Sequence, residues 1–522
     1  MGETEARERL ARVERAAAER RDEGRAAAVA KQHARGRLTV RERITRLFDP
    51  ASFREFGTLV APARDTEENR AVDAPADGVV TGSGLIDGRP AVVVGQDFTV
   101  LGGSSGRVGG EKTRRAGELA IRHGWPLVFL LEGGGHRIQD GQDARHFAHA
   151  TPFFQQLCTL SGWAPIVAGV FGPGFAGPTN YAGLADFVVM VRGQATMGLA
   201  GPALVKAGTG EEIDAEALGG AEVQVDRYGL ADLGVDSEDE AIAAIRGFLS
   251  YLPSNARAAP PLTATTAAPS TAAEELLDLV PANTRQSYDV RRVIRLLVDP
   301  GSLFEIKPTF ARNLVTGFAR LGGRAVGFIA NQPQRLGGMI DAAACDKGAH
   351  FIAVCDAFGL PLIYLVDVPG FSIGSAAEKT VLGRRSAKLL HELGQATVPR
   401  VSIILRKGYG LGYFAMCGGR SFGADAVWAW PTAEICAMSV EGAIDVAYRK
   451  EYLAAPDPEA RRAELIDETR QRLHAIRAAE GFGVDEVIDP RSTRARLIEL
   501  LGNAQPRRHP GGPPKFRPIA PI

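Results

Sequence analysis

The stretch VVVGQDFTVLGGSSGRVGGEK at residues 92–112 has a counterpart 235 residues later, GFIANQPQRLGGMIDAAACDK at residues 327–347. Each copy runs from a short apolar strand through a Leu-Gly-Gly turn into a segment that ends on a lysine. Further matches keep nearly the same spacing: GWPL at 124–127 with GLPL at 359–362, and GPGFAGP at 172–178 with RKGYGLG at 406–412. This near-constant offset predicts an internal duplication of about 230 residues, and two copies indicate tandem domains rather than a solenoid.

Both copies show the same order of predicted elements. Helices are expected at Glu111–His123 and Asp346–Ala357, and each is followed by an unbroken apolar strand, PLVFLL in the first copy and PLIYLVDV in the second. Unbroken apolar strands that alternate with helices are typical of parallel sheets covered on both faces. The predicted fold class is therefore α/β, with two tandem domains related by internal duplication.

Composition along the chain suggests where the domains begin and end. The N-terminal residues alternate charged side chains with Ala and Leu at helical spacing, which predicts a helical extension. The stretch 256–272 is rich in Ala, Pro and Thr and has no aromatic residue, as linkers do. The expected organisation is an N-terminal helical extension at 1–34, a first domain at 35–253, a linker at 254–284, a second domain at 285–504 and a Pro-rich tail at 505–522.

The overall composition excludes several classes of protein. The 522 residues carry 61 Lys and Arg against 61 Asp and Glu, so the net charge gives no footprint for nucleic acid or an anionic membrane. Five cysteines without CxxC spacing indicate reduced thiols, and nine histidines without ligand spacing predict no metal site. Because the N-terminus is charged and no apolar run approaches ~18 residues, we expect a cytoplasmic protein that does not enter a membrane.

Two glycine motifs imitate nucleotide-binding signatures. GPGFAG at 172–177 matches GxGxxG, but it lies well inside the domain and its counterpart lacks the pattern. GRVGGEKT at 106–113 resembles a phosphate-binding loop, but Glu111 displaces the lysine. Lys112 recurs as Lys347, and a lysine on a helix face is usually solvated. Neither motif supports a nucleotide site.

Glycine-rich loops follow the buried strands of both copies. One pair is EGGGH at 132–136 and DVPG at 367–370, and the other is GFAG at 174–177 and GYGLG at 408–412. At the carboxyl ends of parallel strands, small residues let backbone N–H groups approach a ligand, and two such groups on one carbonyl oxygen form an oxyanion hole. Tight strand–helix packing is the alternative reason for a glycine loop. Because four loops occupy equivalent places in two copies, the sequence favours enolate chemistry.

These segments resemble the carboxyltransferase (beta) subunit of biotin-dependent acyl-CoA carboxylases of the propionyl-CoA and methylcrotonyl-CoA carboxylase type. The strings that carry the resemblance are DFTVLGGSSGRVGGEK, EGGGHRIQDG, VDVPGF, ILRKGYGLGYFAMCGG and AWPTAEICAMSVEGA, between about Arg35 and Asp489. The resemblance implies two crotonase-like domains, with carboxybiotin and an acyl-CoA meeting between the first domain of one subunit and the second domain of another. It also implies a homohexamer built as a trimer of dimers.

The expected cofactor is biotin on a separate carrier protein, because the sequence contains no Met-Lys-Met biotinylation site. A biotin carboxylase and carrier subunit is therefore the expected partner, and acyl-CoA the expected substrate. The resemblance implies that carboxybiotin releases CO2 and that N1 of biotin takes the α-proton of the thioester. No side chain is then required as a base, which agrees with the lack of an obvious acid/base pair.

Motif matching carries the family's functional positions onto this chain. The predicted catalytic groups are the backbone amides of the two oxyanion pairs, Ala176 and Gly177 in the first half and Leu411 and Gly412 in the second. The predicted contacts with the acyl-CoA are Gly133, Gly134, Gly135, Arg137 and Phe414. The predicted contacts with biotin are Pro369, Gly370 and Gly410.

Several residues depart from the family pattern and leave the acyl group open. Phe414 stands where propionyl- and acetyl-type members carry Asp, and Gln224 and Tyr228 replace a His and a Ser. We expect Phe414 to form an apolar pocket for a larger, branched or unsaturated acyl chain. Two other functions remain open: a biotin-linked or biotin-independent decarboxylase or transcarboxylase acting on a malonyl-type thioester, and a non-catalytic, carboxylase-like scaffold.

Overall fold

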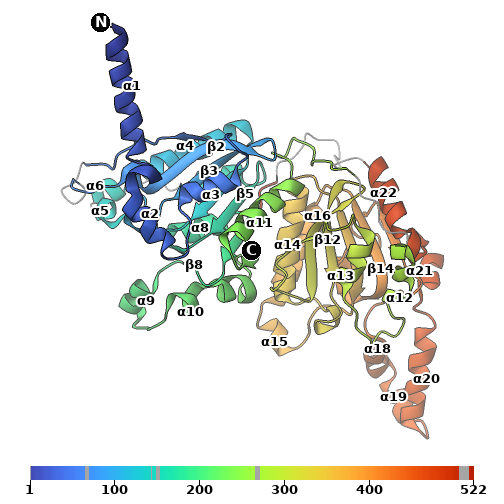
Figure 1. Ribbon diagram of the computed structural model, residues 1–522. Helices are drawn as coiled ribbons and strands as arrows, with labels where there is room; N and C mark the ends of the chain where they lie inside the picture. The colour runs from blue at the N-terminus through green and yellow to red at the C-terminus, as the bar shows by residue number, and fades with distance from the viewer. Residues whose placement is uncertain are drawn as a thin grey trace. The chain divides into compact units, whose positions relative to one another are not determined.

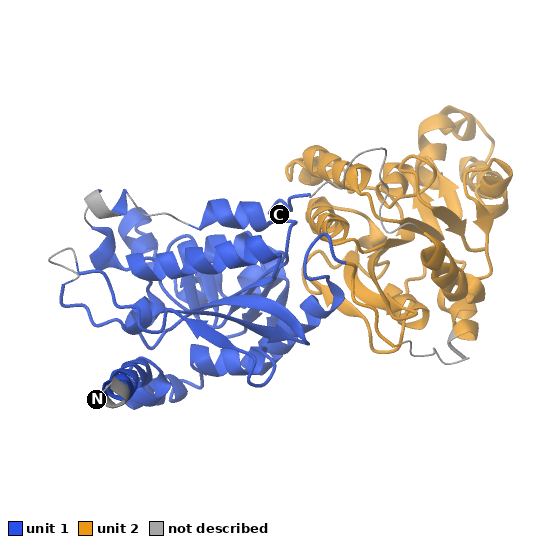
Figure 2. Cartoon of the chain, turned by 90° about the horizontal axis from the view of Figure 1, so that it is seen from above, with its two compact units in different colours: residues 1–258, 516–521 blue, residues 259–515, 522 orange. Residues whose placement is uncertain are grey.

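The computed structural model describes residues 2–64, 70–142, 144–148, 153–264, 271–504 and 517–521. The chain forms two compact units, which Figure 2 colours separately. Unit 1 holds the residues up to Ala258 together with 517–521, and unit 2 begins at Ala259. Most of the predicted Pro-rich tail lies outside the described residues.

Unit 1 is built on a seven-stranded sheet in the order β1-β2-β3-β4-β5-β7-β9 (Figure 1). Its strands are β1 (Arg54–Phe56), β2 (Val79–Ile86), β3 (Arg89–Gln96), β4 (Leu127–Leu131), β5 (Ile166–Val170), β7 (Phe187–Val191) and β9 (Leu233–Val235), with β6 (Pro173–Phe175) and β8 (Thr196–Gly198) as a separate parallel pair. Its helices are α1 (Gly2–Ala18), α2 (Ala26–His33), α3 (Val40–Leu47), α4 (Arg107–His123), α5 (Ile138–Gly141), α6 (Ala144–Phe147), α7 (Phe154–Leu160), α8 (Gly177–Gly183), α9 (Pro202–Thr209), α10 (Ala215–Gly219) and α11 (Glu238–Tyr251).

Unit 2 repeats this plan with an eight-stranded sheet in the order β10-β11-β12-β13-β14-β15-β17, in which β16 also pairs with β14. Its strands are β10 (Phe304–Ile306), β11 (Leu314–Leu321), β12 (Arg324–Asn331), β13 (Leu362–Val368), β14 (Arg400–Tyr409), β15 (Ala426–Ala429), β16 (Glu434–Cys436) and β17 (Glu486–Val487). Its helices are α12 (Thr271–Leu279), α13 (Val290–Leu297), α14 (Ala342–Ala357), α15 (Ser375–Glu378), α16 (Leu382–Gln395), α17 (Gly410–Ala415), α18 (Val440–Ala447), α19 (Arg449–Leu453), α20 (Pro458–Arg470), α21 (Ala475–Glu480) and α22 (Thr493–Asn503).

The strand registers confirm the duplication. In unit 1 the parallel pair β3–β4 aligns Val92 with Leu127, and in unit 2 the pair β12–β13 aligns Gly327 with Leu362. In both units an antiparallel hairpin precedes the parallel strands. The parallel strands are buried along their length, as their unbroken apolar sequences predict. The predicted α/β class is therefore confirmed.

Both helices that follow the Gly-rich turns begin four residues earlier than the sequence suggests. α4 starts at Arg107 rather than Glu111, and α14 starts at Ala342 rather than Asp346. The α14 start is explained by Asp341, whose side chain accepts a hydrogen bond from the Ala344 N–H at 2.8 Å and so caps the helix. In α4, Gly109 and Gly110 lie in the first turn, and because glycine has a low helix propensity the sequence did not indicate that the helix begins before them.

The predicted linker contains a helix that belongs to unit 2. α12 follows the undescribed residues 265–270, and its Leu276 and Leu279 are buried in the core around β11 and β13. α12 is therefore part of a compact unit, because its leucines recur at helical spacing on one face. Among the described residues, no helix combines the length and apolar character needed to cross a membrane.

The two recurring lysines are buried, so the expectation that they are solvated was wrong. Lys112 Nζ donates to the carbonyl oxygens of Ala76 (3.1 Å) and Val79. Lys347 Nζ donates to the carbonyl oxygens of Lys307 (2.8 Å), Phe310 (2.9 Å) and Leu314 (2.7 Å). Each lysine thus satisfies carbonyl groups where the chain enters β2 or β11, a structural role that recurs in both copies.

Lys112 is expected to make the stability of the protein depend on pH. Burial lowers the pKa of Lys112 to about 8, whereas the same side chain in the unfolded chain keeps its ordinary pKa of 10.5. Between these values the unfolded state binds the extra proton, so the free energy of unfolding should rise with pH, by up to about 3 kcal/mol in total. Denaturant unfolding at pH 8 and pH 10 should show a rise for the native protein that Lys112→Met lacks. Parallel slopes in the two proteins would contradict the assignment.

Candidate active site

In unit 1 the loop after β4 lies against the start of α8. Gly133, Gly134 and Gly135 follow β4, and Gly177 is the first residue of α8. A Cβ atom on Gly135 would lie 3.6 Å from the backbone N of Gly177, whereas a Cβ atom on Gly134 or Gly177 would meet no atom within 4 Å. The chain's own packing therefore does not require glycine at 134 or 177, and the open space beside the backbone suits close approach by a ligand.

The backbone amides at this junction differ in availability. Nothing in the described part of the chain accepts a hydrogen bond from the N–H of Gly135 or Gly177. The Ala176 N–H, in contrast, donates to the Gly198 carbonyl at 2.8 Å, and Pro178 has no N–H. Of the predicted Ala176–Gly177 pair, only the Gly177 N–H is therefore available to a ligand. The Gly135 N–H, in the neighbouring loop, is a second available donor.

Unit 2 contains the same junction. The Ser105 N–H donates to the Gly135 carbonyl at 2.9 Å, and the Ile340 N–H donates to the Gly370 carbonyl at 3.0 Å. These bonds place Gly370 where unit 1 has Gly135. A Cβ atom on Gly412 would lie 2.9 Å from the Gly370 Cα, so the loop after β13 touches the start of α17.

Backbone torsion angles align the two helix starts. Ala176, the residue before α8, has φ 65°, and Gly410, the first residue of α17, has φ 59°. These two positive φ values mark the same bend of the chain in the two units. Leu411 is therefore the structural equivalent of Gly177, and Gly412 is the equivalent of Pro178. In the described chain, no acceptor is found for the N–H of Gly370 or Leu411. The structure thus presents two equivalent amide pairs, Gly135 with Gly177 and Gly370 with Leu411.

Replacing Ala176 with glycine is expected to stabilise the protein. Ala176 adopts φ 65° and ψ −125°, a conformation that glycine reaches readily and that strains a residue with a Cβ atom. We expect Ala176→Gly to raise the free energy of unfolding by about 1 kcal/mol, measured by urea denaturation. The exposed, helical Ala463 gives a matched control, because Ala463→Gly should lower it by a similar amount. Destabilisation at both positions would contradict the strain at Ala176.

Arg137 lies beneath the unit 1 loop rather than beside open space. Its side chain is 1% exposed, Nη1 lies 2.5 Å from Asp77 Oδ1, and Nη2 donates to the Ser104 carbonyl at 3.2 Å. Asp77 also accepts from the Gly109 N–H at 2.7 Å, and burial raises the pKa of its carboxyl group. Arg137 therefore positions the loop that carries Gly135, and the sequence contained no signal that Asp77, distant in the chain, is its partner.

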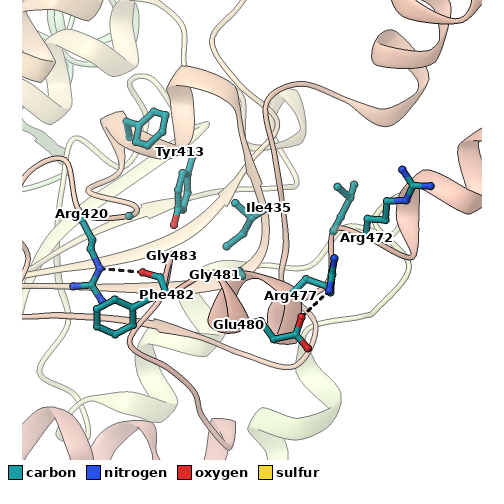
Figure 3. A pocket seen from close by; sticks show the side chains of 13 residues that line it. Tyr413, Arg420, Ile435, Arg472, Arg477, Glu480, Gly481, Phe482 and Gly483 are labelled. Atoms are coloured by element: carbon teal, nitrogen blue, oxygen red, sulfur yellow. Dashed lines mark hydrogen bonds and ion pairs between the residues drawn. The ribbon is translucent and has the colours of Figure 1, made fainter.

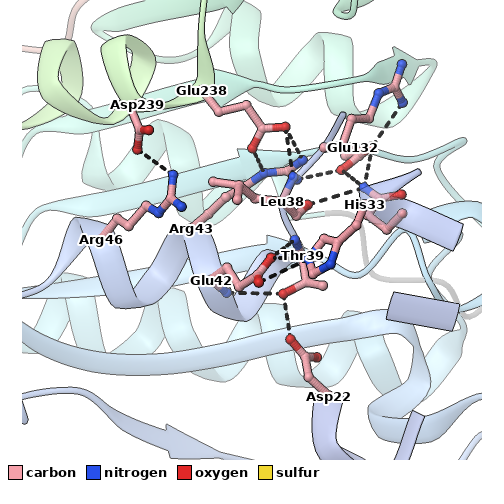
Figure 4. Close-up of polar contacts among 12 residues, drawn as sticks. Asp22, His33, Leu38, Thr39, Glu42, Arg43, Arg46, Glu132, Glu238 and Asp239 are labelled. Carbon is pink, nitrogen blue, oxygen red and sulfur yellow. Dashed lines mark hydrogen bonds and ion pairs between the residues drawn. The ribbon is translucent and has the colours of Figure 1, made fainter. Parts of the chain in front are cut away.

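A second buried ion cluster holds the base of the same loop (Figure 4). Glu132 directly precedes the glycines, is fully buried, and accepts from Arg43 and from Arg37 Nη1 at 3.0 Å. Arg43 also binds Glu238 through Nε (2.6 Å) and Nη2 (2.9 Å). Asp367 is the unit 2 counterpart and pairs with Arg406 at 3.0 Å. Both carboxylates are therefore committed to ion pairs inside the protein and do not serve as acid or base.

Phe414 lines a wide pocket in unit 2, shown in Figure 3. The pocket has a volume of about 790 Å³, and its walls combine Phe414 and Ile435 with the guanidinium-bearing Arg420, Arg472 and Arg477. Arg420 pairs with Asp485 at 2.6 Å, and Arg477 pairs with Glu480 at 2.8 Å. The predicted apolar character around Phe414 is thus only partial, because cationic groups share the walls.

The remaining predicted residues lie at the same loops. Gly410 is the first residue of α17, directly after β14, and a Cβ atom on it would lie 3.1 Å from the Ala437 carbonyl oxygen. Pro369 follows the last residue of β13 and precedes Gly370. Gln224 is buried and donates to the Met197 carbonyl at 3.0 Å, whereas Tyr228 is exposed. Within the described residues, no group of three or more His, Cys, Asp or Glu side chains could hold a metal ion.

Comparison with known proteins adds a family and several relatives. The family described as carboxyl transferase domain matches residues 31–511. The methylmalonyl-CoA carboxyltransferase 12S subunit of Propionibacterium freudenreichii subsp. shermanii is 42% identical over 91% of this chain and 90% of its own length. The propionyl-CoA carboxylase carboxyltransferase subunit of Haloferax mediterranei is 40% identical, over 92% and 93% respectively. The methylmalonyl-CoA decarboxylase subunit alpha of Veillonella parvula is 39% identical, over 97% and 96%.

A solved structure has the same fold. A crystal structure of transcarboxylase 12S, described as a hexamer assembly with methylmalonyl-coenzyme A and methylmalonic acid bound, superposes with a TM-score of 0.86 at 40% identity. The superposition covers 95% of this chain and 94% of that chain. The similarity therefore extends over both units.

Proposed function

This chain belongs to the carboxyl transferase domain family, and on that premise we propose that it transfers a carboxyl group between carboxybiotin and the α-carbon of a short acyl-CoA. It is a carboxyltransferase of the biotin-dependent acyl-CoA carboxylase and transcarboxylase type, with the crotonase-like fold that the resemblance implied. The observation that carries the proposal is the presence of two equivalent amide pairs, one in each unit.

We assign the acyl thioester to unit 1. There the N–H groups of Gly135 and Gly177 would both donate to the thioester oxygen, which becomes negatively charged when the α-carbon loses its proton. Open space at Gly134 and Gly177 admits the thioester next to the backbone. The proposed role of these residues is to stabilise the enolate, and the proposal requires no side chain of unit 1 as a base.

We assign the ureido group of biotin to unit 2, at the N–H groups of Gly370 and Leu411. When bound, carboxybiotin supplies the carboxyl group and accepts the α-proton at its ring nitrogen. The open space at Gly370, where a Cβ atom would meet nothing within 4 Å, admits the ureido group next to the backbone. Leu411 is 68% exposed, so its side chain is not part of the protein core.

We propose propionyl-CoA, with methylmalonyl-CoA as its carboxylated form, as the substrate pair. The support comes from the names of relatives at about 40% identity, a carboxylase of propionyl-CoA and a carboxyltransferase of methylmalonyl-CoA. A larger acyl chain directed against Phe414 is the second candidate, and the volume of the Phe414 pocket favours it. The charged and ion-paired side chains in the walls of that pocket favour the shorter substrate, because a long hydrocarbon chain gains little from contact with charged groups.

The proposed partners follow from the same family. We propose that biotin arrives on a separate carrier protein with a biotin carboxylase, and that the chain assembles as a hexamer, as described for transcarboxylase 12S. The relative from Veillonella parvula, which is 39% identical, is named a methylmalonyl-CoA decarboxylase subunit, and decarboxylation is the reverse of carboxylation. Loss of carboxylate from methylmalonyl-CoA is therefore the alternative reaction of the same amide pairs.

A carboxylation assay separates these possibilities. The protein is combined with a purified biotin carboxylase and biotin carrier, ATP, bicarbonate and acyl-CoAs from acetyl to branched and enoyl chains. Carrier-dependent formation of methylmalonyl-CoA is the expected result. A preference for long or branched chains would favour the Phe414 candidate, and carboxylate loss from methylmalonyl-CoA without carrier would favour the decarboxylase. Binding of CoA esters with no turnover in any arm would contradict catalysis and leave a scaffold.

A further inference from the structure

Unit 1 contains a small cavity directly behind its amide pair. Its volume is about 50 Å³ and its lining includes Leu131, at the end of β4, and Tyr181, on α8. Tyr181 lies four residues after Gly177, so it is on the same face of α8 as the amide donor. Ser105, whose N–H bonds to the Gly135 carbonyl, also lines the cavity. The cavity thus lies next to both loops that would hold the thioester.

Aromatic side chains form a rigid wall of this cavity. The Phe129 ring stacks on Tyr181 with ring centroids 5.4 Å apart, and Phe153 meets Phe129 edge to face at 6.0 Å. Phe129 and Phe153 are almost fully buried. Such packed rings have little freedom to rearrange, so they limit the depth of the cavity.

Three polar groups in the wall already have partners within the protein. Gln96 Oε1 accepts from the Glu132 N–H at 3.1 Å, and Thr113 Oγ1 donates to the Gly109 carbonyl at 3.0 Å. The Tyr181 hydroxyl bonds to the backbone of Phe153. A guest in the cavity is therefore offered mainly apolar contact, which suits an alkyl group better than a hydroxyl or a carboxylate.

The size of the cavity selects a short alkyl group. An engineered apolar cavity of about 150 Å³ holds benzene, and a space a third as large holds one or two groups of the size of a methyl. We propose that this cavity binds the alkyl group attached to the α-carbon of the acyl-CoA, and that it sets an upper limit of about four acyl carbons. The proposal rests on the proposed function and adds the determinant of acyl length, which lies in unit 1 rather than at Phe414.

Gly110 provides a test that should leave the fold intact. It lines the cavity from the first turns of α4, and a Cβ atom there would meet no heavy atom within 4 Å. Gly110→Ala therefore adds a methyl group to a lining residue of the cavity without a clash, and alanine is the better residue inside a helix. Gly502, in α22 of unit 2, is a matched control, because its Cβ atom would also meet nothing and it is not in the cavity wall.

The experiment compares propionyl-CoA with acetyl-CoA for the native protein, Gly110→Ala and Gly502→Ala. Dissociation constants are measured by calorimetry and kcat/KM by carrier-dependent carboxylation. One methylene in a fitted pocket is worth about 10- to 200-fold, so Gly110→Ala should lower the propionyl-to-acetyl ratio of kcat/KM by at least 10-fold. The ratio of dissociation constants should shift in the same direction, and Gly502→Ala should keep both native ratios.

The outcomes separate this inference from the proposed function. If the native protein carboxylates propionyl-CoA and Gly110→Ala keeps the native ratios, the cavity does not bind the alkyl group and the proposed function stands. If no acyl-CoA is carboxylated, the proposed function fails. The ratio of the dissociation constants of propionyl-CoA and acetyl-CoA then tests by itself whether the cavity binds the alkyl group. A Gly110→Ala protein that binds propionyl-CoA and acetyl-CoA in the native ratio overturns the inference in either case.

Discussion

Removing the Gly177 N–H is expected to lower kcat for acyl-CoA carboxylation by about 10²- to 10³-fold, with a much smaller change in KM. Gly177 is the first residue of α8, a position where proline fits the backbone and removes only the N–H. Because the donor is needed most when negative charge develops on the thioester oxygen, its loss should appear in kcat rather than in substrate binding.

The variant is best made with glycine at the preceding position. Ala176 has a positive φ, and proline at the next position restricts the residue before it, so Ala176→Gly supplies the freedom that the turn requires. The informative quantity is the ratio of kcat between Ala176→Gly and Ala176→Gly/Gly177→Pro. Thermal unfolding and calorimetric binding of CoA establish that the double variant is folded. A ratio below about 3 would exclude Gly177 as an oxyanion donor.

Replacing Arg137 with methionine is expected to lower the free energy of unfolding by about 3–5 kcal/mol. The substitution leaves the carboxylate of Asp77, which is 0% exposed, without its cation. Burial raises the pKa of Asp77, and loss of the guanidinium should raise it further. Since the carboxyl group in the unfolded chain has its ordinary pKa of 3.8, the variant should lose more stability at pH 8 than at pH 5.5.

A second substitution makes the Arg137 test specific. In Arg137→Met/Asp77→Asn one of the two buried carboxyl groups that Arg137 pairs with, Asp77 and Asp140, is neutral. About half of the lost stability should therefore return, and the extra loss at pH 8 should become smaller. Urea denaturation at both pH values measures these differences. Equal stability of the single and double variants at pH 8 would show that the ion pair does not hold the loop. The catalytic consequence should be a lower kcat, because the Gly135 amide moves with its loop.

The fold was predictable because it depends on patterns that sequence displays directly. Unbroken apolar strands and a repeated offset are visible without coordinates, and the strand registers reproduce that offset. Helix starts were less predictable, since Gly109 and Gly110 weaken the helical pattern of α4. The burial of the lysines was not predicted, because the sequence of a helix does not show which loop packs against it. In the structure, the loops beside Lys112 and Lys347 offer buried carbonyl oxygens.

The loops of the candidate site were predictable, but their individual atoms were not. Motif matching located Ala176 and Leu411, yet only the structure shows that the Ala176 amide is bonded to Gly198 and that Gly410 is its torsional counterpart. Arg137 illustrates the same limit. A sequence motif places an arginine in the loop, but the orientation of the Arg137 side chain depends on Asp77, which lies 60 positions away along the chain.

The use of main-chain donors has a consequence for the evolution of this protein. The N–H of Gly177 or Leu411 survives almost every single substitution at its own position, because nineteen of the twenty amino acids keep that group. Side chains around the pair carry no such protection, so random mutation should alter the choice of acyl-CoA far more often than it abolishes turnover. A scaffold of this kind is well suited to drift among neighbouring substrates while its chemistry stays fixed.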